Sequence, residues 1–139
     1  CTFRTKTDCQ VYAIGRQVFR KCFGRDNNRI QEYERLLDQV ELLTPLLVSE
    51  RAEIARHARG FVTFKPGDVI IEQGADLPEM LYYVIASGTG VATKATDPNY
   101  RVDLRTGDGF GDKACIHKRK RHNFTMRAGP GGAKCLLVP

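Results

Sequence analysis

The sequence lacks the features that mark several large classes of protein. No apolar run approaches the ~20 residues that a membrane span requires, and the first residues are polar, without the apolar stretch of a signal peptide. The five cysteines have neither metal-binding nor disulfide spacing, which predicts reduced thiols and a cytoplasmic protein. No nucleophile and base, and no pair of catalytic acids, can be recognised, so we do not expect an enzyme.

Charge also narrows the possible partners. The chain has a formal net charge of +6, much of it in the run 117–122. Its 139 residues are enough for one domain with some additional chain. No aromatic stacking motif accompanies the basic run, which favours a solvated loop over a nucleic-acid site. Cys115, His117 and His122 do not form a zinc pattern, so no metal is expected.

The first part of the chain has helical patterns after one short strand. Residues 9–14 are typical of a strand, and residues 15–23 of a short amphipathic helix. Apolar residues at helical spacing predict a helix over 29–40. Ser49 is expected to cap a further helix over 50–57.

From Gly60 onward the pattern changes to short apolar runs separated by glycine and proline. Such a pattern is typical of a β-sandwich or β-roll, with a hairpin tip at 97–99. With the helices before it, it predicts a mixed α+β fold. The expected strands cover residues 61–64, 69–71, 81–85, 90–93, 101–104 and 135–138.

The most informative stretch is Gly107-Asp108-Gly109-Phe110-Gly111-Asp112-Lys113-Ala114, with Arg121 ten residues after Gly111. A glycine-rich turn that opens a helix presents N–H groups to a phosphate, and a guanidinium can hold the phosphate oxygens. Asp112 can accept a hydrogen bond from a sugar hydroxyl. The spacing G-x-G-x-G, with no βαβ unit around it, does not fit a Rossmann fingerprint. The stretch therefore indicates a nucleotide site.

The run Phe110-Gly111-Asp112-Lys113-Ala114-Cys115, with Arg121 in register, resembles the phosphate-binding cassette of cyclic nucleotide-binding domains. Residues 64–74 resemble the first β-roll segment of that family, and residues 81–88 its next strand and turn. The resemblance implies a jelly-roll-like β-roll flanked by helices. The ligand-binding residues that it implies, for the cyclic phosphate and ribose, are Gly111, Asp112, Lys113, Ala114, Arg121 and His122.

Three positions of the cassette bear on the ligand. Lys113 is similar to the cassettes of cGMP-dependent protein kinases, whereas His122 stands where cGMP-selective members have Thr or Ser. Asp112 stands where the family has glutamate and is one methylene shorter. Two interpretations of Asp112 stay open: a hydrogen bond to the ribose 2′-hydroxyl, or a negative charge at a helix N-terminus.

A weak internal repeat bears on the domain organisation. Residues 125–138 repeat the layout of residues 2–14 with one residue inserted. Together with the cassette, this predicts a tandem array. Residues 1–26 are then the last strand and hinge helix of a preceding cyclic nucleotide-binding domain. Residues 27–139 form a second such domain without its C-terminal hinge and lid helices, which the resemblance puts beyond Pro139.

By resemblance, the expected function is to bind cGMP in a regulatory domain of a cGMP-dependent protein kinase of protist or apicomplexan type. Ligand would shift a conformational equilibrium toward release of the kinase domain in the same chain. The implied partners are the cyclic nucleotide, neighbouring domains of the same type and that kinase domain. Two alternatives stay open: a degenerate domain that serves as a structural relay, and a cAMP-binding regulatory domain.

Overall fold

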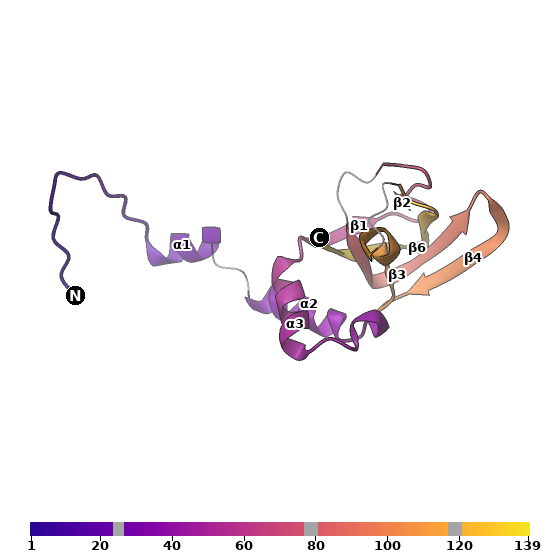
Figure 1. Ribbon diagram of the computed structural model, residues 1–139, viewed down its shortest axis with the longest axis horizontal. Helices are drawn as coiled ribbons and strands as arrows, with labels where there is room; N and C mark the ends of the chain where they lie inside the picture. Colours follow the sequence, from indigo (N-terminus) through magenta and orange to yellow (C-terminus); the bar gives the residue numbers. More distant parts are fainter. Residues whose placement is uncertain (24–26, 77–80, 117–120) are drawn as a thin grey trace.

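In the part of the chain that the structure describes, six antiparallel strands form the sheet, and helices pack beside it (Figure 1). The computed structural model describes residues 1–23, 27–76, 81–116 and 121–139. The strands are β1 (Gly60–Phe64), β2 (Val69–Ile71), β3 (Tyr82–Lys94), β4 (Asp97–Arg105), β5 (Gly109–Phe110) and β6 (Thr125–Val138). The helices are α1 (Arg16–Phe23), α2 (Asn27–Leu37), α3 (Val48–His57) and α4 (Asp112–Ile116), with a short 3-10 turn η1 (Glu41–Leu43).

Two long strands organise the sheet. β6 lies between β1 and β3, and β4 pairs with β3, giving the order β1-β6-β3-β4. The short strands β2 and β5 pair with β6 and β3 respectively. The β3–β6 register shifts near Gly88, whose φ is +83° and where a Cβ would lie 2.2 Å from the carbonyl oxygen of Gly132. A residue without a side chain lets the two strands approach at this bend.

The sheet is buried on two sides because side chains alternate along each strand. Val84 and Leu136 face the helices and pack with Leu37, while Ile85 and Cys135 face the interior of the roll. Each of these five residues has a relative exposure of 0 %. The expected α+β roll flanked by helices is therefore confirmed.

Helix α2 carries the expected apolar face. The buried residues of this helix are Tyr33, Leu36 and Leu37, and Val40 is buried just beyond its end. The Tyr33 ring packs edge to face on Phe61 of β1, with ring centroids 5.1 Å apart. The spacing that predicted this helix thus also identified the residues that join it to the sheet.

The cap predicted for α3 is wrong. The helix begins at Val48, so its N-cap is Leu47 rather than Ser49. Leu47 has no polar side chain, and its backbone N–H donates instead to the carboxylate of Glu50 at 2.7 Å. The acid in the first turn therefore satisfies the N–H of the N-cap residue, which is one half of a capping box.

Several strand limits also differ from the prediction. The expected strands 81–85 and 90–93 are one continuous strand, β3, and 135–138 is only the last part of β6. The hairpin turn lies at residues 95–96, because Lys94 pairs with Asp97, so the expected tip at 97–99 is the start of β4. Pairing with a long partner extends strands through glycines that the sequence pattern treats as breaks.

Residues 9–14, expected to form a strand, are without regular structure, whereas the predicted helix after them is present as α1. Figure 1 shows residues 1–23 running away from the rest of the chain. Residues 1–19 are exposed throughout, including Val18 and Phe19 of α1. Among the described residues no strand pairs with residues 9–14.

Candidate functional site

The cassette begins where β5 pairs with β3 and turns into α4. Phe110 is 4 % exposed and stacks on Tyr83, with ring centroids 5.0 Å apart and planes 2° from parallel. Gly111 follows with a φ of +95°, and a Cβ there would lie 2.6 Å from the carbonyl oxygen of Leu81. Phe110 therefore anchors the turn, and only glycine fits the next position without displacing the backbone at Leu81, just before β3.

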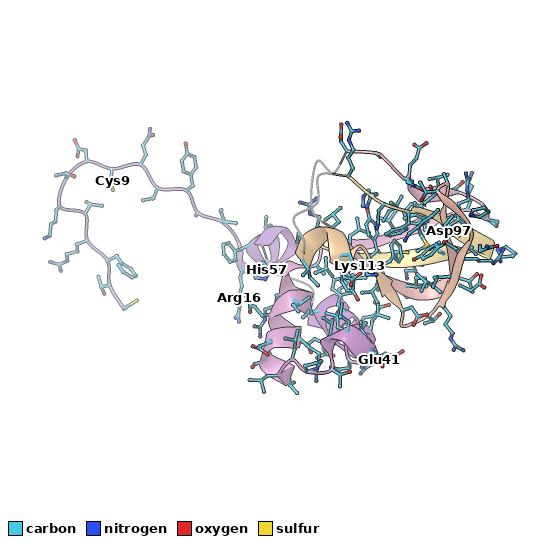
Figure 2. The ribbon with its side chains drawn as sticks, turned by 45° about the vertical axis from the view of Figure 1, so that its right-hand side comes forward. Cys9, Arg16, Glu41, His57, Asp97 and Lys113 are labelled. Atoms are coloured by element: carbon cyan, nitrogen blue, oxygen red, sulfur yellow. The ribbon has the colours of Figure 1, made fainter. Side chains whose placement is uncertain are left out.

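A pocket of about 150 Å³ opens beside this turn. Its lining combines apolar side chains with charged groups of both signs, among them Asp112 and Lys113 from the first turn of α4. Figure 2 shows Lys113 on the short helix beside the roll. The lining residues are Ala92, Lys94, Tyr100, Val102, Leu104, Gly109, Phe110, Gly111, Asp112, Lys113, Asn123, Phe124 and Met126.

The hairpin of β3 and β4 supplies a wall that the sequence did not reveal. Lys94 and Tyr100 both line the pocket, and the ammonium of Lys94 lies 4.1 Å from the centre of the Tyr100 ring. This is a cation–π contact between two strands. Its sequence signal is a lysine before a tight turn and an aromatic residue a few positions after it, which is too common to single out.

Arg121 lies next to a second segment that the sequence analysis did not connect with it. Its Nε is 3.0 Å from Oδ1 of Asp76, in an ion pair that is largely exposed. The backbone supports the contact: the N–H of Gly74 donates to the carbonyl of His122 at 2.9 Å, and the N–H of His122 donates to the carbonyl of Ala75 at 3.3 Å. The pair is thus held by a short β-bridge.

His122 is half-buried beside Phe124, with ring centroids 6.2 Å apart. Burial lowers the pKa of His122 below its usual value of 6.5, because the charged imidazolium loses water. Its Nδ1 atom is buried and has no hydrogen-bond partner among the described residues. The imidazole is therefore neutral near pH 7.

The structure brings together three of the six residues implied by the resemblance. Gly111, Asp112 and Lys113 line the pocket, while Arg121 and His122 belong to the bridge with residues 74–76 and do not line it. Ala114 lies in α4, and the placement of its side chain is not described. Residues 117–120 of the basic run lie outside the described residues. The ligand roles of all six stay predictions.

The described residues carry two further findings on function. No helix among them is long and apolar enough to cross a membrane. No group of three or more His, Cys, Asp or Glu side chains in these ranges is arranged to hold a metal ion.

The fold is that of the cyclic nucleotide-binding β-roll, as in the regulatory domains of protein kinase A. The chain is 32 % identical over 138 residues to the cAMP-dependent protein kinase regulatory subunit of Aspergillus fumigatus, covering 93 % of the chain and 33 % of that protein. It is 34 % identical over 119 residues to the regulatory subunit of Schizosaccharomyces pombe, covering 85 % and 28 % respectively. The chain thus spans a third or less of the length of these curated relatives.

A solved structure supports the same relationship. The regulatory domain of Toxoplasma gondii protein kinase A, crystallised with cAMP, has a TM-score of 0.73 and 27 % identity. The match covers 90 % of the chain and 48 % of that structure. No protein-family model matches the chain. These relatives are named regulatory subunits of cAMP-dependent kinases, so they favour the cAMP alternative over the expected cGMP-dependent kinase.

Proposed function

We propose that the chain is a regulatory domain that binds cAMP, in a regulatory subunit of a cAMP-dependent protein kinase. The observation that carries the proposal is that Asp112 and Lys113 line a partly apolar pocket, on a turn that only Gly111 allows. The purine would occupy the apolar part of the pocket, and Asp112 would accept a hydrogen bond from the ribose 2′-hydroxyl. The likeness to cAMP-dependent regulatory subunits supports the choice of ligand.

His122 also supports cAMP over cGMP. By the resemblance, cGMP-selective domains have a hydroxyl side chain directly after the cassette arginine. This chain has an imidazole whose buried Nδ1 has no hydrogen-bond partner in the part of the chain that the structure describes. A ring of that size, packed near Phe124, does not reproduce a small hydroxyl donor beside a guanine. Selectivity would follow from the loss of that contact.

The regulatory step would be an exchange of partners at Arg121. A cyclic phosphate is an anion that can replace the carboxylate of Asp76 on the guanidinium. The exchange would release residues 74–76 and draw Arg121 toward α4. A ligand that binds this arrangement better shifts the population toward it, and a kinase catalytic subunit that binds the other arrangement is released.

The N-terminal segment fits this proposal as part of another domain. Residues 1–26 would be the tail of a preceding cyclic nucleotide-binding domain, and residues 27–139 the second domain. Val18 of α1 is 56 % exposed, which is consistent with a helix whose apolar face packs elsewhere in a longer protein.

Calorimetric titration of the folded chain with cAMP and with cGMP tests the proposal. We expect saturable one-to-one binding of cAMP and weaker binding of cGMP. Arg121→Ala should weaken cAMP binding at least about tenfold, or about 1.4 kcal/mol. The matched control is Arg105→Ala, which removes an exposed arginine of β4 outside the pocket. Folded protein that binds neither nucleotide would overturn the proposal.

A structural relay is the second candidate, because Arg121 is held by Asp76 and does not line the pocket. The variant Asp112→Glu with His122→Thr distinguishes the two. Binding that appears only in this double variant would mean that the natural cassette no longer takes ligand and that the domain acts as a spacer.

A further inference from the structure

Tyr82, the first residue of β3, lies with its hydroxyl against the backbone of β5. A Cβ on Gly109 would lie 1.9 Å from the Tyr82 Oη and 2.4 Å from its Cζ. The phenol therefore occupies the space that any other residue at position 109 would need. The hydroxyl therefore lies beside Gly109, which precedes Asp112 by three residues in the chain.

Asp112 lies between two cavities. One is the candidate ligand pocket, and the other is a hollow of about 250 Å³ on the side of η1, here called the rear pocket. The two share Leu104, Gly109 and Asp112 as a common wall, whereas Tyr82 lines only the rear pocket. Asp112 thus belongs both to the wall of the ligand pocket and to the rear pocket that Tyr82 lines. The rear pocket is lined by Val40, Glu41, Leu42, Tyr82, Leu104, Gly107, Asp108, Gly109 and Asp112.

The electrostatics of Tyr82 make it a hydrogen-bond donor at this wall. Burial, then the carboxylates of Asp112 and Asp108, raise the pKa of Tyr82 to about 12. The phenol is therefore protonated across the physiological range. Asp108 already accepts the backbone N–H of Arg105 at 2.9 Å, whereas the carboxylate of Asp112 has no such hydrogen bond among the described residues.

We propose that Tyr82 is a positioning residue for Asp112, donating its hydroxyl hydrogen to one carboxylate oxygen while the other accepts the ribose 2′-hydroxyl. The inference rests on the proposed function. An ionised carboxylate has acceptor sites for both bonds. A short aspartate has little reach, so a fixed donor behind it keeps the free oxygen directed at the ligand.

Two nucleotides separate this role from a general effect on the site. Tyr82→Phe removes the hydroxyl and keeps the ring, and should weaken cAMP binding about tenfold. Binding of 2′-deoxy-cAMP, which lacks the hydroxyl that Asp112 would bind, should change little. The matched control is Tyr83→Phe, which removes a hydroxyl from the next residue of the same strand, where the ring stacks on Phe110. In an Asp112→Asn background, Tyr82→Phe should have no further effect on cAMP binding.

The outcomes distinguish this inference from the proposed function. One outcome is that Asp112→Asn weakens the binding of cAMP more than that of 2′-deoxy-cAMP while Tyr82→Phe affects the two nucleotides equally. In that case the ligand role of Asp112 stands and the Tyr82 inference is overturned. If the folded natural chain binds no cyclic nucleotide, the proposed function fails. The contact between Tyr82 and Asp112 is then tested by the melting temperatures of the natural chain, Tyr82→Phe, Asp112→Asn and the double variant. Melting shifts for Tyr82→Phe and Asp112→Asn that simply add would overturn it, and a smaller shift in the Asp112→Asn background would support it.

Discussion

The guanidinium of Arg121 and the carboxylate of Asp76 form an ion pair with an Nε–Oδ1 distance of 3.0 Å, although 45 residues separate them in the chain. The side chains are 68 % and 80 % exposed, so the pair itself adds little stability. Its position matters more than its strength. Under the proposed function, the carboxylate of Asp76 and an incoming phosphate would compete for the same guanidinium.

Asp76→Asn should therefore strengthen cAMP binding. An exposed pair of this kind is worth ~0.2–1 kcal/mol, which corresponds to a gain of up to about fivefold. Titration calorimetry at low and high salt measures the gain, which should shrink as salt screens the pair. Asp103→Asn is the control, because it removes the same charge from another exposed pair, Arg101 with Asp103 at 3.2 Å. A weaker affinity in Asp76→Asn would mean that Asp76 orients Arg121 for the phosphate instead of competing with it.

Gly111→Ala should destabilise the fold and the cassette together. The φ of +95° is strained for alanine, and the new Cβ would lie 2.6 Å from the carbonyl oxygen of Leu81. We expect a loss of ~2–4 kcal/mol in the free energy of unfolding, measured by urea denaturation. Gly67→Ala separates the two causes, because Gly67 has a φ of +79° and nothing within 4 Å of its Cβ. That variant should lose only ~1 kcal/mol, and equal losses would contradict the role of the Leu81 contact.

Local patterns predicted the parts of the fold that depend on local periodicity. The helical spacing of apolar residues identified the face of α2 that packs on the sheet, and the glycine-rich run identified the turn into α4. Both follow from residues close together in the chain. The pocket residues Gly111, Asp112 and Lys113 were accessible to prediction for the same reason.

Long-range pairing explains what the sequence could not reveal. Nothing near Arg121 identifies Asp76 as its partner, since a β-bridge between distant segments brings them together. Tyr82 and Gly109 likewise meet only because β5 pairs with β3. The segment 9–14 has the composition of a strand but no partner strand among the described residues, and a strand needs its partner to form.

Cys135 should resist alkylation while the protein is folded. Its side chain is fully buried, and burial raises the pKa of its thiol to about 11. The thiolate is the reactive form, so both access and ionisation are suppressed. Cys1 and Cys9 are free and exposed and serve as internal controls. With iodoacetamide at pH 8, peptide mass spectrometry should find Cys9 modified and Cys135 protected until urea unfolds the chain. Equal modification rates without urea would contradict the burial of β6.

His122 should make the fold less stable in mild acid. Its pKa is lowered by burial in the folded protein, whereas the unfolded chain has the ordinary value of 6.5. Above that value neither state binds a proton at this site. As the pH falls below it, the unfolded state binds the proton first, so stability is lost with falling pH down to the folded pKa. The melting temperature should therefore fall between pH 7 and 5.5, and His122→Gln should flatten that fall. His57→Gln, which removes an exposed imidazole on α3, should leave it unchanged. A fall of the same size in His122→Gln and the natural chain would mean that other groups control the acid sensitivity.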